Sequence, residues 1–332
     1  MKKNVFLFSS ALLCLFANAQ EQKEIKKGMQ AAIADKFPFT RVLDVQYMQY
    51  LPSDFDTELF GDDFQEGTIQ NHSRLRVSAN LPVIMKPKWN ITTSLIYVYE
   101  NYDFKNTSNT GSYSNAPLPN GKHDFHYLSG SLSFTYFSKL FKKPFLYNAS
   151  IFTDGTEQSP ERLKGFIGAT LVLKRTAQTT ITTGLLVFID PASPVPVTPI
   201  FTLEHKFKDS KWVFDCILPQ RVLFKRDVFK NSRISVGSEL APSGFYIYLN
   251  QPGFADVYDY RQLEVRTGLT FETLLAKDLI AYGKAGWANT FNSRVTERGE
   301  LTSKYVMAAT QDGTGYVSLG MSFNPFSKKV KM

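Results

Sequence analysis

Apolar and polar residues alternate one by one in long runs along most of the chain. The clearest run, 128–136, reads Leu-Ser-Gly-Ser-Leu-Ser-Phe-Thr-Tyr, with serine or threonine at every second position. Successive side chains of a β-strand point to opposite faces, so a period of two predicts strands with one apolar and one polar face. Several runs approach the ~9–11 residues that cross a bilayer at a tilt, and exceed the roughly 5–6 of soluble strands. Further alternating runs lie at 43–48, 74–83, 90–100, 167–174, 181–189, 201–206, 263–272 and 316–323.

The segments between the runs differ in length in a regular way. Short, mostly charged connections are predicted at 86–89, 141–144, 176–179, 208–211 and 276–278. Long polar segments separate them, at 52–68, 105–122, 154–164, 191–196, 251–259 and 292–312. Short turns at one end and long loops at the other are typical of transmembrane β-barrels, whereas a β-sandwich distributes its long loops over both ends. The sequence therefore predicts an all-β, transmembrane antiparallel β-barrel.

The number of strands depends on one region. Trp212 to Leu218 and Val222 to Phe224 flank Pro219-Gln220, and these two arms are too short to span a bilayer. Leaving this hairpin out predicts about 12 strands, and including it makes 14 possible. Pro242-Ser-Gly244 predicts a bulge or kink in the next strand. We expect the last run, Tyr316 to Phe326, to close the barrel against the run 41–50.

The N-terminus predicts export. Lys2 and Lys3 precede a mostly apolar segment at 5–16, and Ala17-Asn-Ala19 fits a cleavage site, so residues 1–19 are interpreted as a signal peptide. A membrane anchor is the alternative, but the apolar segment is shorter than the ~20 residues of a spanning helix. We divide the rest into a periplasmic lead-in at 20–40, a barrel at 41–326 and a basic tail at 327–332. Export and a barrel together predict the outer membrane of a Gram-negative bacterium.

Charged residues on the polar faces of the runs form the candidate functional surface. In a barrel they would face the lumen, where unpaired charges without water are costly. Both signs are present, so two interpretations stay open: a closed interior joined by salt bridges, or a hydrated pore or ligand tunnel. The candidate lumen residues are Arg74, Arg76, Glu100, Lys174, Glu204, Lys206, Glu264, Arg266 and Glu272.

Motifs of enzyme chemistry are missing from the sequence. No Gly-x-Ser-x-Gly, phosphate-binding loop, His-Glu-x-x-His or cysteine pair occurs. His123 and His126 are three residues apart, so on one strand they would face opposite sides. We therefore expect no catalytic residues, no metal and no cofactor. The basic residues are not interleaved with aromatic residues as in a nucleic-acid groove, so we expect no nucleic-acid partner.

The middle of the chain carries a motif that resembles a known group of proteins. Residues 212–219 read Trp-Val-Phe-Asp-Cys-Ile-Leu-Pro. With the signal peptide and the alternating runs, the chain is similar to uncharacterised families of Gram-negative outer-membrane β-barrels, named as domains of unknown function. The resemblance implies the architecture and location, and no catalytic residue comes with it.

Taken together, the runs and charges predict a passive channel or small-molecule transport barrel with a charged, polar lumen. A closed barrel with a structural or surface-interaction role is the alternative, and a membrane-embedded lipid hydrolase ranks third. The expected partners are outer-membrane lipid and lipopolysaccharide, the barrel-assembly and periplasmic chaperone machinery, and an unknown small solute.

Overall fold

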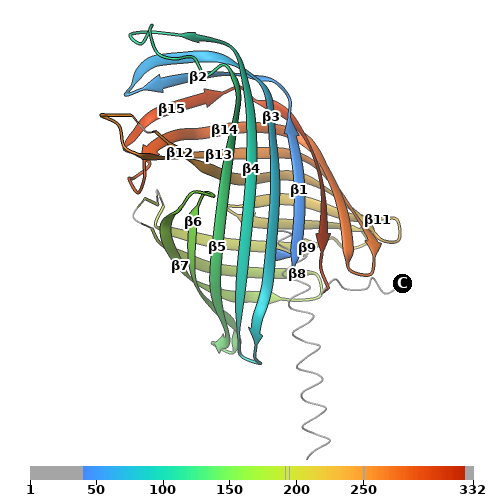
Figure 1. Ribbon diagram of the computed structural model, residues 1–332. Helices are drawn as coiled ribbons and strands as arrows, with labels where there is room; N and C mark the ends of the chain where they lie inside the picture. Colours follow the sequence, from blue (N-terminus) through green and yellow to red (C-terminus); the bar gives the residue numbers. More distant parts are fainter. Residues whose placement is uncertain (1–39, 191, 194, 250, 326–332) are drawn as a thin grey trace, which may run out of the picture.

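The computed structural model describes residues 40–325 except 191, 194 and 250, and these residues form sixteen β-strands (Figure 1). Among them, no helix is long and apolar enough to cross a membrane. The predicted signal peptide, nearly all of the lead-in and the basic tail lie outside the described residues. The strands are β1 Leu43–Tyr50, β2 Ser53–Leu59, β3 Asp62–Met85, β4 Trp89–Asn109, β5 Gly121–Leu140, β6 Lys143–Gly155, β7 Pro160–Arg175, β8 Thr179–Ile189, β9 Val197–Lys206, β10 Trp212–Leu218, β11 Arg221–Val228, β12 Ser232–Tyr248, β13 Val257–Ala276, β14 Leu279–Glu297, β15 Tyr305–Gln311 and β16 Thr314–Phe323.

The strands pair antiparallel and close into a barrel. From β3 to β14 each strand pairs with its neighbour in sequence, and β1 and β16 join β3 to β14 at one end of the barrel. At the other end β2 and β15 fill the same two places, since β2 pairs with β3 and β15 pairs with β14. The ring thus has 14 strand positions. The preferred count of 12 is wrong, because the short hairpin of β10 and β11 belongs to the ring between β9 and β12.

The predicted pairing of the last strand with the first, which closes the barrel, is confirmed. β1 pairs with β16 from Leu43 opposite Phe323 to Tyr50 opposite Tyr316. On β16 the apolar side chains face outward, and Leu319 is 71% exposed. The alternate positions are enclosed, with Ser318 at 2% and Ser322 at 1%. The period of two therefore assigned the two faces of this strand correctly.

The two ends of the barrel differ as predicted. Turns of two to five residues join β3 to β4, β5 to β6, β7 to β8, β9 to β10, β11 to β12 and β13 to β14. Phe141 and Lys142 form such a two-residue turn with φ angles of 51° and 62°, the left-handed conformation that a tight hairpin requires. At the opposite end, 52–68 and 292–312 were predicted as loops but consist mainly of the β2–β3 and β14–β15 hairpins. We call these ends the short-turn end and the long-loop end.

The interior is filled at the long-loop end. The half of β12 nearest the long-loop end packs across the barrel against β5, where the rings of Phe125 and Phe245 stack with centroids 3.8 Å apart. Pro242 produces no bulge, since the register between β12 and β13 is unbroken along the whole of β12. The predicted bulge is wrong; β12 instead loses its pairing with β11 after Glu239. The cluster around these rings, here the aromatic plug, comprises Phe55, Ile69, Tyr102, Phe104, Phe125, Phe245, Ile247 and Tyr260.

Candidate functional site in the barrel interior

A cavity of about 580 Å³ lies in the barrel next to the aromatic plug. Five of the nine candidate lumen residues line it: Arg74, Arg76, Glu100, Arg266 and Glu272. Glu264 is buried beside them and binds Arg266.

The other three candidates, Lys174, Glu204 and Lys206, lie at the short-turn ends of β7 and β9 and do not line this cavity. The polar face of the runs thus contributes a compact group of six residues rather than a charged wall around the whole lumen.

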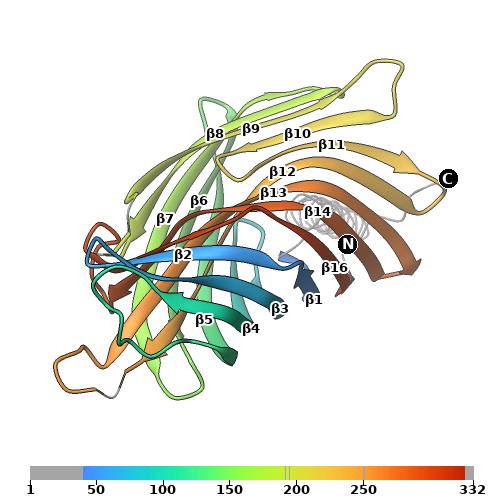
Figure 2. The same cartoon turned by 90° about the horizontal axis from the view of Figure 1, so that it is seen from above.

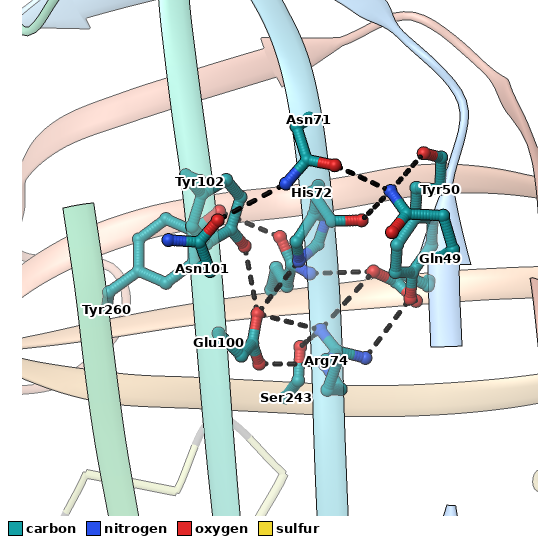
Figure 3. Close-up of polar contacts among 12 residues, drawn as sticks. Gln49, Tyr50, Asn71, His72, Arg74, Glu100, Asn101, Tyr102, Ser243 and Tyr260 are labelled. Atoms are coloured by element: carbon teal, nitrogen blue, oxygen red, sulfur yellow. Dashed lines mark hydrogen bonds and ion pairs between the residues drawn. The ribbon is translucent and has the colours of Figure 1, made fainter. Parts of the chain in front are cut away.

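Glu100 is the centre of one buried polar group (Figure 3). Arg74 Nε donates to its Oε1 at 2.8 Å, and Arg74 Nη2 donates to its Oε2 at 3.2 Å. Tyr102 Oη donates to Oε2 at 3.0 Å, and His72 Nε2 lies 3.0 Å from the same oxygen. The imidazole of His72 is stacked between the rings of Tyr50 and Tyr102, at centroid distances of 4.3 and 4.0 Å. The carboxylate is therefore held by charged and neutral donors from β3 and β4.

Tyr50 connects this group to a second carboxylate. Its hydroxyl donates to Glu264 at 2.9 Å and accepts hydrogen bonds from Arg74 at 3.2 Å and Arg266 at 2.8 Å. Glu264 also accepts hydrogen bonds from Arg266 at 2.6 Å and from Gln262 at 2.7 Å. Charged groups this deeply buried remain ionised only where such partners replace water. β1, β3 and β13 are thereby joined across the interior.

A third polar group lies toward the short-turn end. Arg41 binds Glu272 at 2.6 Å and donates to Ser322 at 3.1 Å, and Ser322 donates to Asp44 at 2.6 Å. Tyr282 donates to the same aspartate at 3.0 Å. These bonds join the two ends of the chain's barrel region, since residues 41 and 44 meet residues 282 and 322.

A fourth group closes the cavity on the side of β6, β7 and β8. Arg162 binds Asp259 at 3.1 Å and also pairs with Asp190, while Arg261 binds Asp259 at 2.5 Å. Nearby, Lys164 and Asp154 form an ion pair at 2.5 Å, and Tyr246 donates to Asp154 at 2.9 Å. The long-loop end is thus sealed by ion pairs as well as by aromatic rings.

Positive charge exceeds negative charge around the cavity. Ten lining side chains are lysine or arginine and six are aspartate or glutamate. Two further carboxylates, Asp215 and Glu264, lie outside the lining and pair with lining cations. Arg76 is half-buried, and among the described residues no carboxylate lies within ion-pair distance of its guanidinium. The cavity therefore offers a cation that forms no ion pair with the described residues.

Sequence reasoning missed His72 and Tyr50. The alternating run predicted at 74–83 begins two residues after His72, but β3 is 24 residues long and continues through this histidine. Positions 72, 74 and 76 have the same parity, so extending the run by one step would have put His72 on the inner face. Tyr50 occupies the end of β1 next to Leu51-Pro52, where the sequence contains no signal for an interior partner.

The two histidines weighed for an enzyme bind separate partners. His123 Nε2 lies 3.1 Å from the carbonyl oxygen of Pro119, and His126 Nδ1 lies 2.9 Å from the hydroxyl of Tyr97. Within the part of the chain that the structure describes, no group of three or more His, Cys, Asp or Glu could hold a metal ion.

No family model and no curated protein match the chain. Its fold is similar to an outer membrane channel from Pseudomonas putida F1, with 11% identity, coverage of 85% of this chain and 94% of the channel, and a TM-score of 0.35. For a Pseudomonas aeruginosa FadL homologue the values are 8%, 85%, 90% and 0.38. For the outer membrane phospholipase A of Escherichia coli they are 10%, 84%, 93% and 0.33. At TM-scores below 0.5 none of these similarities bears on what this chain does.

Proposed function

We propose that the protein is an outer-membrane transport barrel whose cavity binds and passes a small anionic solute. The observation that carries this proposal is the excess of cationic side chains around the cavity, with Arg76 lacking an ion-pair partner among the described residues. An arginine in a partly desolvated cavity attracts carboxylate, sulfate or phosphate groups, which accept its fork of N–H donors.

The outer surface supports the membrane location. Large apolar side chains are exposed around the whole ring, such as Leu95 at 59%, Ile167 at 54% and Leu319 at 71%. In water this surface would be an aggregation hazard, whereas lipid chains cover it favourably. This apolar surface supports our proposal that the barrel lies in a membrane, the outer membrane.

We infer that the lumen opens at the short-turn end. Thr92, Ser94 and Ser131 face inward on β4 and β5, opposite the exposed apolar positions, and each is only half-buried. Small polar side chains that remain partly accessible to solvent indicate a hydrated interior between the cavity and the short-turn end. The aromatic plug and the ion pairs of Arg162 close the other end. A solute that crosses must therefore displace this seal.

Conductance in planar bilayers tests the route. We expect the wild-type protein to conduct weakly, and the double variant Phe125→Ala, Phe245→Ala to conduct at least ~10-fold more, because these stacked rings are part of the seal. Phe141→Ala is the matched control, since this side chain is 81% exposed in a short turn and should leave conductance unchanged.

The reversal potential in a potassium chloride gradient tests the charge. We expect anion selectivity in the double variant, and a shift toward cation selectivity when Arg76→Glu is added. Lys174→Glu makes the same charge change on an exposed residue outside the cavity lining and should have a smaller effect. Cation selectivity without the Arg76 change would refute the proposal.

A closed barrel with a structural role is the second candidate, favoured by the ion pairs that join non-adjacent strands across the interior: Arg41 with Glu272, Arg74 with Glu264, and Arg162 with Asp259. It predicts no conductance from either the wild type or the double variant, and no solute uptake into proteoliposomes. That pair of results would replace the transport proposal by this one. We propose no enzymatic activity.

A further inference from the structure

The barrel wall is much lower on one side than on the other. β3, β13 and β14 contain 24, 20 and 19 residues, whereas β10 and β11 contain 7 and 8. Seen from the long-loop end, β8, β9, β10 and β11 follow one another along one side of the wall (Figure 2). A membrane-spanning strand needs ~9–11 residues, and β10 and β11 are shorter. The register places their turn at the level of Thr183 on β8, whereas Val187 and Ile189, farther along β8, still expose apolar side chains.

Beyond this turn, toward the long-loop end, β9 and β12 lose their pairing with β10 and β11. β11 pairs with β12 only as far as Glu239, and the last bond runs from the Leu240 N–H to the Gln220 carbonyl oxygen at 2.7 Å. β10 pairs with β9 only as far as Phe201. Among the described residues, 197–200 of β9 and 241–248 of β12 therefore have no strand partner on the sides that face each other.

Both free edges carry a proline at the position where an N–H would point into the gap. The amide of Leu240 points toward β11, so Pro242, two residues on, occupies the same side of the strand. On β9 the even-numbered residues 196 and 206 bond to β8, so Pro199 lies on the side of β10. Proline at these places removes a donor and blocks the two edges from pairing. The interruption is thus built into the sequence.

The cavity extends to this interruption. Gln220, Leu240, Pro242 and Gly244 border the break and also line the cavity. An open sheet edge exposed to lipid is unfavourable unless it lines a wet or occupied space. We propose that the break, bounded by 197–200, 219–220 and 240–248, is a lateral window through which a membrane-soluble ligand enters the cavity.

The window selects an amphiphile with one apolar chain and an anionic head group. Arg221 and Lys225 line the cavity on β11, next to the window, and both pair with Asp215, so two cations face one carboxylate there. Phe152, Phe166 and Phe188 have the same parity as Asp154, Lys164 and Asp190 on β6, β7 and β8, so they face inward, and the rings of Phe166 and Phe188 lie 6.2 Å apart. The strip of phenylalanine rings beside the Arg221–Lys225 pair fits such a molecule. A cavity volume of 580 Å³ suits one small ligand. This assignment rests on the proposed transport function and names its substrate class.

The test blocks the window after folding, so that misfolding cannot account for the result. Gln220→Cys is introduced together with Cys216→Ala, folded in lipid vesicles, and modified with a bulky maleimide. The backbone of Gln220, not its side chain, accepts the Leu240 bond, so the pairing is preserved. Leu185→Cys in the same background is the control, since Leu185 is outward-facing and 45% exposed on β8. The probe is a fluorescent single-chain alkyl sulfonate.

We expect modification at position 220 to weaken probe binding by at least ~10-fold and modification at position 185 to leave it unchanged. A zwitterionic analogue of the same chain should bind the unmodified protein more weakly than the sulfonate. Unchanged binding after modification at 220 would overturn the window, and equal binding of the two probes would overturn the anionic head group. The reversal-potential measurement is independent, because chloride enters from the short-turn end; its result decides the transport function separately.

Discussion

Replacing Glu100 by glutamine probes the buried polar group of Figure 3 most directly. The side chain of Glu100 is 3% exposed and accepts hydrogen bonds from Arg74 and Tyr102, with His72 at 3.0 Å. The amide keeps the shape of the carboxylate but removes its charge, and it places an N–H₂ group against neighbouring donors.

The expected loss of unfolding free energy can be derived from the surroundings of Arg74. Removing one partner of a buried ion pair costs about 3–5 kcal/mol, because the remaining charge is left uncompensated. Glu264 lies 3.7 Å from Arg74 and still offers partial compensation. We therefore expect Glu100→Gln to lower the free energy of unfolding by about 3 kcal/mol, at the lower end of this range.

Urea unfolding of the protein in lipid vesicles, followed by tryptophan fluorescence, measures this change. Glu300→Gln is the control: it breaks a 2.8 Å pair with Lys304 whose two side chains are 43% and 66% exposed. Solvent screens such a pair, so the control should unfold like the wild type. If Glu100→Gln lies within about 0.5 kcal/mol of the wild type, the ion pair does not contribute as we describe.

Two further predictions concern β16. Leu319→Arg places a charge on the lipid face and should reduce stability by about 2–4 kcal/mol near the midplane, whereas Ser318→Arg forces a large side chain into a 2%-exposed site and should also impair folding. The fraction of protein that shows heat-modifiable migration on an SDS gel measures both, and full tolerance of either would contradict the assigned faces. Gly320→Ala should cost about 1–3 kcal/mol, because a Cβ would lie 2.3 Å from the ring of Tyr282 and displace it; an unchanged urea midpoint would show that the ring moves freely.

The architecture could be read from the sequence to a large extent. Alternation is a local property, and it assigned the outward face of Leu319 and the inward face of Ser318 without any knowledge of their neighbours. It also placed Arg74, Glu100 and Arg266 inside. It failed at β10 and β11, where strand length argued against a place in the ring, although a short strand can pair on both sides without spanning the bilayer.

The sequence by itself determined which face of each strand meets lipid, because that choice depends only on residues two positions apart. The tertiary structure alone decided which interior residues meet. Tyr50 binds Glu264, 214 residues away, through the closure of the ring, and no local pattern specifies that distance. The stacking of Phe245 of β12 on Phe125 of β5 across the barrel likewise follows from tertiary packing. The charged cavity and its window exist because these long-range contacts place residues from distant strands around one space.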